Sequence, residues 1–234
     1  MGTVADLKRL FSLRKLLTLT AVNFLNDIIG VVTYLKLNNI LQSEYSLTYL
    51  FGRYFCNEIS TVEYAQFVSF YGIAVFFAVN KVNDDYKKYG AFFLTRLGSK
   101  HYVFGKTFSN IIFSFFLCCF SVLQSYITHF VFGIRLLLEE YTCIVVTSFL
   151  IMTLLIEISL LFFSLFKNYV ISFLATFVAM TAYAVAFNIK KISIPSPDNI
   201  SMGFVYIIIV YFLLMAFRTW KMLSSDFVLS KIKE

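Results

Sequence analysis

Long apolar runs alternate with short polar stretches along this chain. A helix that crosses a bilayer needs about 20 mostly apolar residues, because each residue adds about 1.5 Å of rise. Six runs reach or approach this length, and the shortest is expected to recruit residues on either side. We therefore predict an all-α polytopic membrane protein, a single transmembrane domain over residues 1–234, with spans at about 16–35, 67–82, 108–132, 142–166, 169–187 and 204–220.

Polar side chains recur at helical spacing in three of these spans. Lipid offers them no hydrogen bonds, so the polar stripes are expected to face protein or water. Their members are Thr20, Asn23, Asp27, Gly30 and Tyr34 in the first span; Ser114, Ser121, Gln124, Ser125 and Thr128 in the third; and Ser172, Thr176, Ala179 and Tyr183 in the fifth. The candidate polar residues within the membrane are Asn23, Asp27, Gln124 and Glu157.

The two acids, Asp27 and Glu157, allow two interpretations. Ionisable groups inside a membrane often mark a polar pathway or a proton site. Alternatively, both are structural carboxyls that bond to hydroxyl or amide groups on neighbouring helices. The sequence predicts no basic partner at this depth, which favours the structural interpretation for both acids.

The composition supports a membrane protein. Of the 234 residues, 59% are hydrophobic and 14% are charged, against about 25% charged residues in soluble domains. A sizeable soluble domain is therefore excluded. Frequent Phe, Ile, Asn and Lys are typical of a low-GC bacterial genome, so the expected location is the bacterial cytoplasmic membrane.

The distribution of positive charge predicts the orientation. Fifteen of the 20 Lys and Arg residues fall in segments on the side of the two termini. Because cytoplasmic loops collect Lys and Arg, both termini are predicted to be cytoplasmic. The net charge of +7 then follows from the Lys and Arg residues on the cytoplasmic loops of a protein embedded in a lipid bilayer, and it gives no reason to expect nucleic-acid binding.

Two short segments outside the spans are predicted to lie at the membrane surface. Residues 4–17 form an amphipathic pattern that suits a helix in the headgroup layer. A cleaved signal peptide is the alternative, but no small-residue cleavage site follows. Residues 47–56 are too short to span and are also expected to be interfacial.

Residues 84–107 form the longest charge-rich interruption, and they are predicted to be a cytoplasmic loop. The end of this loop, KHYVFGKT, is similar to a phosphate-binding loop, but Lys100 replaces the first glycine and no strand precedes it. The pattern instead predicts a short helix at 89–97 that Gly98 ends. Its proposed docking side chains are Tyr89, Phe92, Phe93, Arg96 and Leu97. The alternative is a helix that lies on lipid headgroups.

Six spans, cytoplasmic termini, an N-terminal interfacial helix and the segment RLGSKHYVFGK at 96–106 together resemble the permease subunit of a type-2 ABC exporter of the bacterial peptide-export or bacteriocin-immunity type. The resemblance implies that 84–107 carries a coupling helix that docks onto a separate cytoplasmic ABC ATPase. It also implies a second copy of the permease, or a related permease, as partner. The chain departs from the family in its last outer loop, where Pro195 and Pro197 replace re-entrant helices.

The resulting prediction is a permease that exports a hydrophobic or amphipathic peptide and is not itself an enzyme. No cofactor and no metal are expected in this chain, and ATP would bind to the partner subunit. Glu139 and Glu140 lack the Arg and His residues that an intramembrane protease needs, and His101 and His129 lack metal-binding companions. The alternatives are a stand-alone membrane immunity protein and a six-span substrate-binding subunit of a vitamin importer.

Overall fold

The computed structural model describes residues 7–8, 10–41, 50–55, 61–97, 99–134, 138–166, 168–189, 209–218 and 220. All regular structure in this part of the chain is helical. The helices are α2 (Leu13–Leu41), α4 (Gly52–Phe55), α5 (Thr61–Leu97), α6 (Ser99–Val131), α7 (Leu138–Phe166) and α8 (Tyr169–Ile189). A further apolar helix covers Ile209–Arg218.

Four helices are long and apolar enough to cross a membrane, so the protein is an all-helical multi-pass membrane protein. These candidate spans are Leu13–Lys36, Thr61–Asp84, Phe104–Val131 and Leu138–Phe166. They correspond to the first four spans predicted from the sequence. Two shorter apolar helices, Tyr169–Tyr183 and Ile209–Arg218, lie where the fifth and sixth spans were predicted.

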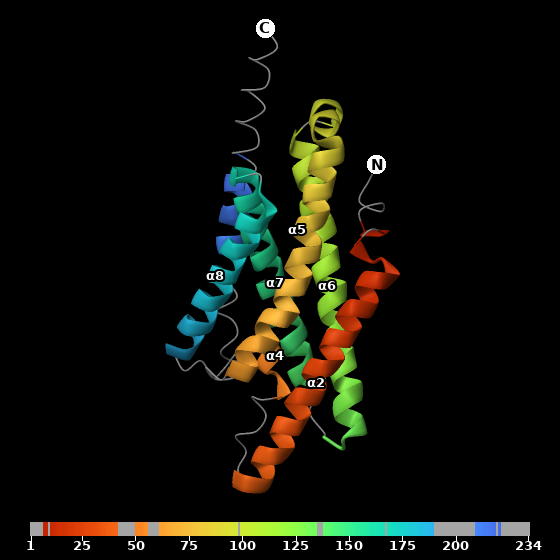
Figure 1. The fold of residues 1–234 in the computed structure, drawn as a ribbon, viewed down its shortest axis with the longest axis vertical. Helices are drawn as coiled ribbons and strands as arrows, with labels where there is room; N and C mark the ends of the chain where they lie inside the picture. The colour runs from red at the N-terminus through yellow and green to blue at the C-terminus, as the bar shows by residue number, and fades with distance from the viewer. Residues whose placement is uncertain are drawn as a thin grey trace.

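The long helices run side by side in alternating directions (Figure 1). We call the end where α5 is followed by α6, between Leu97 and Ser99, the hairpin end, and the end where α2 stops and α5 starts, at Leu41 and Thr61, the far end. Helix α5 is central, because it contacts α2, α4, α6, α7 and α8. The buried face of α5 follows helical spacing: Phe67, Phe70, Tyr71, Ala74, Val75 and Ala78.

The polar stripes face the interior of the bundle, as predicted. Ser121 and Ser125 are fully buried on α6, and Ser172 and Thr176 are fully buried on α8. Ser159 Oγ of α7 donates to the Ser172 carbonyl at 3.1 Å, and Thr176 Oγ1 lies 2.5 Å from Ser159 Oγ. Small hydroxyl side chains thus bring α7 and α8 close together.

Local sequence sets two of the helix boundaries. Helix α6 ends at Val131, and the chain turns at Gly133, whose φ of 73° is accessible to glycine at little cost. The Ile134 N–H donates to the His129 carbonyl at 2.9 Å, which completes a Schellman motif. Helix α8 starts after Asn168, whose side chain accepts a hydrogen bond from the Val170 N–H at 2.9 Å and so caps the helix.

The predicted interfacial helix at 4–17 differs in its boundaries. A single helical turn ends at Phe11, whose N–H donates to the Leu7 carbonyl at 2.8 Å, and α2 then begins at Leu13. Leu10 is buried, and the Phe11 ring packs against Phe113 of α6. The N-terminal turn therefore packs on the bundle, while residues 13–17 belong to the first span; residues 4–6 lie outside the described part.

The segment predicted to be interfacial at 47–56 is in fact buried where the structure describes it. Leu50, Phe51, Arg53 and Tyr54 are each at most 3% exposed. Tyr71 Oη, ten residues into α5, donates to the Tyr54 carbonyl at 3.1 Å, so α4 lies roughly 15 Å inside the far end. The prediction failed because a short segment with an arginine has the composition of a surface loop, whereas here the bundle supplies its polar partners.

The charged interruption at 84–107 is helical rather than a loop. Helix α5 continues to Leu97, and α6 begins at Ser99. The helix predicted at 89–97 is therefore the distal end of α5, and this hairpin projects beyond the neighbouring long helices (Figure 1). Gly105 lies within α6, so no phosphate-binding loop forms there. The side chains of the five predicted docking residues are outside the described part.

Candidate functional site

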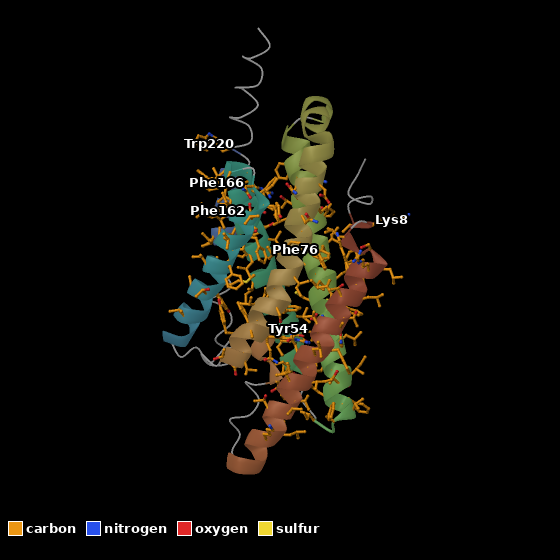
Figure 2. The ribbon with its side chains drawn as sticks, viewed as in Figure 1. Lys8, Tyr54, Phe76, Phe162, Phe166 and Trp220 are labelled. Carbon is orange, nitrogen blue, oxygen red and sulfur yellow. The ribbon has the colours of Figure 1, made fainter. Side chains whose placement is uncertain are left out.

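A buried polar cluster surrounds α4 in the half of the bundle nearer the far end. Its centre is Arg53, which is 2% exposed although it carries a permanent charge. Figure 2 shows Tyr54, the next residue, among the helices in the lower half of the view, well away from Trp220 at the hairpin end. We call the set Asn23, Asp27, Arg53, Tyr54, Ser121 and Ser125 the Arg53 cluster.

Five oxygen atoms surround the Arg53 guanidinium. Nη1 donates to the Asn23 carbonyl at 2.7 Å. Four oxygens lie around Nη2: Tyr54 Oη at 2.6 Å, Asp27 Oδ1 at 3.0 Å, the Ser121 carbonyl at 3.1 Å and Ser125 Oγ. The guanidinium carbon also lies 4.7 Å from the centre of the Tyr54 ring. The cluster thus joins α2, α4 and α6 through a single side chain.

Polar groups next to the cluster extend the contact between helices. Asn23 Nδ2 donates to Ser121 Oγ at 2.5 Å, and Gln124 Nε2 donates to the Thr20 carbonyl at 3.1 Å. Both bonds link α2 to α6. Three of the four intramembrane candidates, Asn23, Asp27 and Gln124, are therefore brought together on the interface between α2 and α6.

The fourth candidate, Glu157, lies elsewhere. Its carboxylate is 2.9 Å from Nε of Arg218, and both side chains are at most 5% exposed. Arg218 Nη2 also donates to Thr107 Oγ1 of α6. This second pair ties the helix Ile209–Arg218 to α6 and α7 near the hairpin end, close to the position of Trp220 in Figure 2.

The expectation that Asp27 and Glu157 lack basic partners is wrong. Arg53 and Arg218 pair with them at 3.0 and 2.9 Å. Sequence analysis missed both arginines because they occur outside the first five predicted spans, in a connecting segment and at the end of the last apolar run. The available signal for Arg53 was its aromatic context, LFGRYFC, which is unusual for a solvated loop.

A third polar contact lies beside α4. His129 Nδ1 is 2.8 Å from Tyr141 Oη, and the Phe51 ring stands edge-on to both rings, with centroids 5.6 and 5.9 Å away. His129 is fully buried and has an aromatic environment. This contact packs the segment of α4 against α6 and α7.

No protein-family model matches the sequence, and neither a curated protein nor a solved structure matches the chain at a significant level. The chemistry of the described residues is that of buried charge held by oxygen atoms. Such an arrangement holds a charged segment inside the helical bundle.

Proposed function

We propose that this chain is the permease subunit of an ATP-driven type-2 exporter in a bacterial cytoplasmic membrane. In this proposal α8 and the helix Ile209–Arg218 complete six spans, and both termini are cytoplasmic. Two permease chains form the pathway, and two soluble ATPase subunits bind below them. A hydrophobic or amphipathic peptide is the proposed cargo, since the chain is rich in Phe and Tyr and poor in charge.

The α5–α6 hairpin is the observation that carries this proposal. Helix α5 continues for 13 residues beyond Asp84, the last residue of its candidate span, which adds roughly 20 Å. The hairpin projects from the same end of the bundle at which α2 begins (Figure 1). Its basic residues are Lys87, Lys88, Arg96, Lys100 and Lys106. A basic helical hairpin at the end that carries the first helix suits a cytoplasmic docking arm.

The central position of α5 supports a coupling role for the hairpin. A continuous helix moves as one body, and α5 contacts every other labelled helix. When the ATPases close on ATP, they draw the two hairpins together, and the spans switch between two packed arrangements. The hairpin would thereby transmit ATPase movement to the pathway without a flexible joint in α5.

Co-purification tests this proposal. The tagged chain, extracted from its native membrane in mild detergent, is expected to retain an ATPase with Walker motifs, identified by mass spectrometry. The double variant Phe92→Ala, Phe93→Ala should lower recovery of the ATPase at least tenfold. The matched control is Phe130→Ala, Phe132→Ala, which removes two exposed rings near the far end and should leave recovery unchanged.

Two results would contradict the permease proposal. One is purification of the intact chain without any ATPase while it still protects cells from a toxin, as an immunity protein would. The other is equal recovery of the ATPase from the Phe92/Phe93 variant and from the unmodified chain. Tight binding of a small molecule by the chain alone would indicate an importer subunit instead.

A further inference from the structure

The environment of Arg53 Nη2 resembles the coordination shell of a metal ion. Nη2 carries two hydrogens, yet four oxygen atoms lie within hydrogen-bond distance of it. Two hydrogens cannot serve four acceptors in good geometry at once. A spherical cation has no such directional limit. We call the oxygens of Asn23, Asp27, Ser121 and Ser125 that surround the guanidinium the oxygen cage.

The charge of the cage fits a monovalent cation. Asp27 supplies its single carboxylate, and the remaining ligands are backbone carbonyls and a hydroxyl. Oxygen ligands of this kind suit hard cations, and one negative charge is neutralised by one positive charge.

Two acceptors of the same cluster remain unused. Asn23 Oδ1 and Asp27 Oδ2 are buried and have no hydrogen-bond partner among the described residues. Buried acceptors without donors are costly, so they favour additional positive charge beside them.

The cage and its present occupant belong to different parts of the fold. Asn23 and Asp27 come from α2, Ser121 and Ser125 come from α6, and these two long helices contact each other directly. Arg53 comes from α4, a helix of four residues. If α4 withdraws, the cage remains on α2 and α6, and the Asp27 carboxylate loses its partner inside the bundle.

We propose that the oxygen cage is a binding site for Na⁺ or K⁺, and that Arg53 occupies it as a tethered cation. A free monovalent ion takes the place of the guanidinium when α4 withdraws, so α4 and the ion compete for one site. This site is independent of the proposed exporter function, and its test needs no ATPase.

The test uses the purified full-length chain in detergent with Arg53→Ala and, separately, Arg53→Gln. Thermal unfolding is measured in N-methyl-D-glucamine chloride and in NaCl or KCl at constant ionic strength. At an ion concentration of about 100 times Kd, the melting temperature of both variants should rise by about 5–10 °C. The unmodified chain should show no comparable rise, because Arg53 fills its cage.

Two controls separate ion binding from general salt effects. Adding Asp27→Asn to Arg53→Ala removes the carboxylate and should abolish the response to Na⁺ and K⁺. Methylguanidinium should also raise the melting temperature of Arg53→Ala, which shows that the cage is intact.

The proposal is overturned if methylguanidinium stabilises Arg53→Ala but Na⁺ and K⁺ do not, because the cage would then accept only a guanidinium. It is equally overturned if the melting temperatures of both single variants are the same in every salt, as protonation of Asp27 would produce. Failure of all the variants to fold in any salt counts against it as well, since a free ion would have failed to replace Arg53.

Discussion

The two buried ion pairs of this protein have the same chemistry and different surroundings. Arg53 meets Asp27 and four further oxygen atoms from three helices. Arg218 meets Glu157 and one hydroxyl, that of Thr107. The first pair holds a four-residue helix inside the bundle, whereas the second holds one end of a longer apolar helix. The arginine on the shorter helix, α4, therefore has more polar partners than the arginine at the end of the longer helix Ile209–Arg218.

The largest expected effect is that of Arg53→Met. This change leaves Asp27 unpaired inside the bundle and removes every bond of the Arg53 guanidinium, so the free energy of unfolding should fall by about 3–5 kcal/mol. Unfolding in mixed detergent micelles measures it. Arg14→Met, at an exposed position, is the control and should change the value by less than about 0.5 kcal/mol. An equal effect of both substitutions would mean that the Arg53 cluster contributes nothing to stability.

Arg218→Met should lower the free energy of unfolding by about 3 kcal/mol, which is less than Arg53→Met. Both variants leave a buried acid unpaired, but Arg218 loses fewer hydrogen bonds. The helix Ile209–Arg218 should also become easier to cleave. Limited proteolysis followed by mass spectrometry detects this, with Trp220→Phe as a control that keeps the ion pair. A loss of stability larger than that of Arg53→Met would reverse the ranking of the two pairs.

Removing both partners of each pair sharpens the comparison. Among the described residues, Glu157→Leu combined with Arg218→Met leaves only Thr107 without its bond, so most of the stability should return, to within about 1 kcal/mol of the unmodified chain. Asp27→Leu combined with Arg53→Met leaves several polar groups without a donor and should remain about 1–3 kcal/mol less stable. Equal recovery in the two double variants would show that the extra oxygens around Arg53 add nothing.

The smallest expected effects come from single hydroxyl groups. Ser125→Ala should cost about 1 kcal/mol, because Arg53 keeps its other oxygen partners. Thr107→Val should cost more, about 1.5–3 kcal/mol, because it removes the sole described hydrogen bond of Arg218 beside its ion pair. The same unfolding measurement ranks the two, and a larger loss for Ser125→Ala would contradict the argument.

Hydrophobic pattern alone predicted much of this fold. The apolar runs at 108–132 and 142–166 correspond to α6 and α7, since a run of that length has few other stable forms. Polar stripes also predicted the inward faces of α2 and α6. These features follow from local sequence, because a helix in lipid must hide its own polar side chains.

The two arginine partners could not be predicted in the same way. Residue 53 lies 26 positions from Asp27 in the sequence, and residue 218 lies 61 positions from Glu157, so no helical spacing relates the members of either pair. Counting Lys and Arg on each side of the membrane also places both arginines outside it, because the count assigns each charged residue to the nearest connecting segment. The insertion of α4 depends on oxygens that α2 and α6 provide together, and only the tertiary structure brings them to one place.

The insertion of α4 has a consequence for the order in which the protein is made. Arg53 leaves the ribosome 72 residues before Ser125, one of its oxygen partners. At synthesis rates of about 5–20 residues per second, roughly 4–14 s separate the two. Until Ser121 is made, the Asp27 carboxylate and the Asn23 carbonyl are the only groups of the cluster on long helices that exist. Helix α4 is therefore synthesised well before α6, which supplies the Ser121 and Ser125 oxygens that bind Arg53.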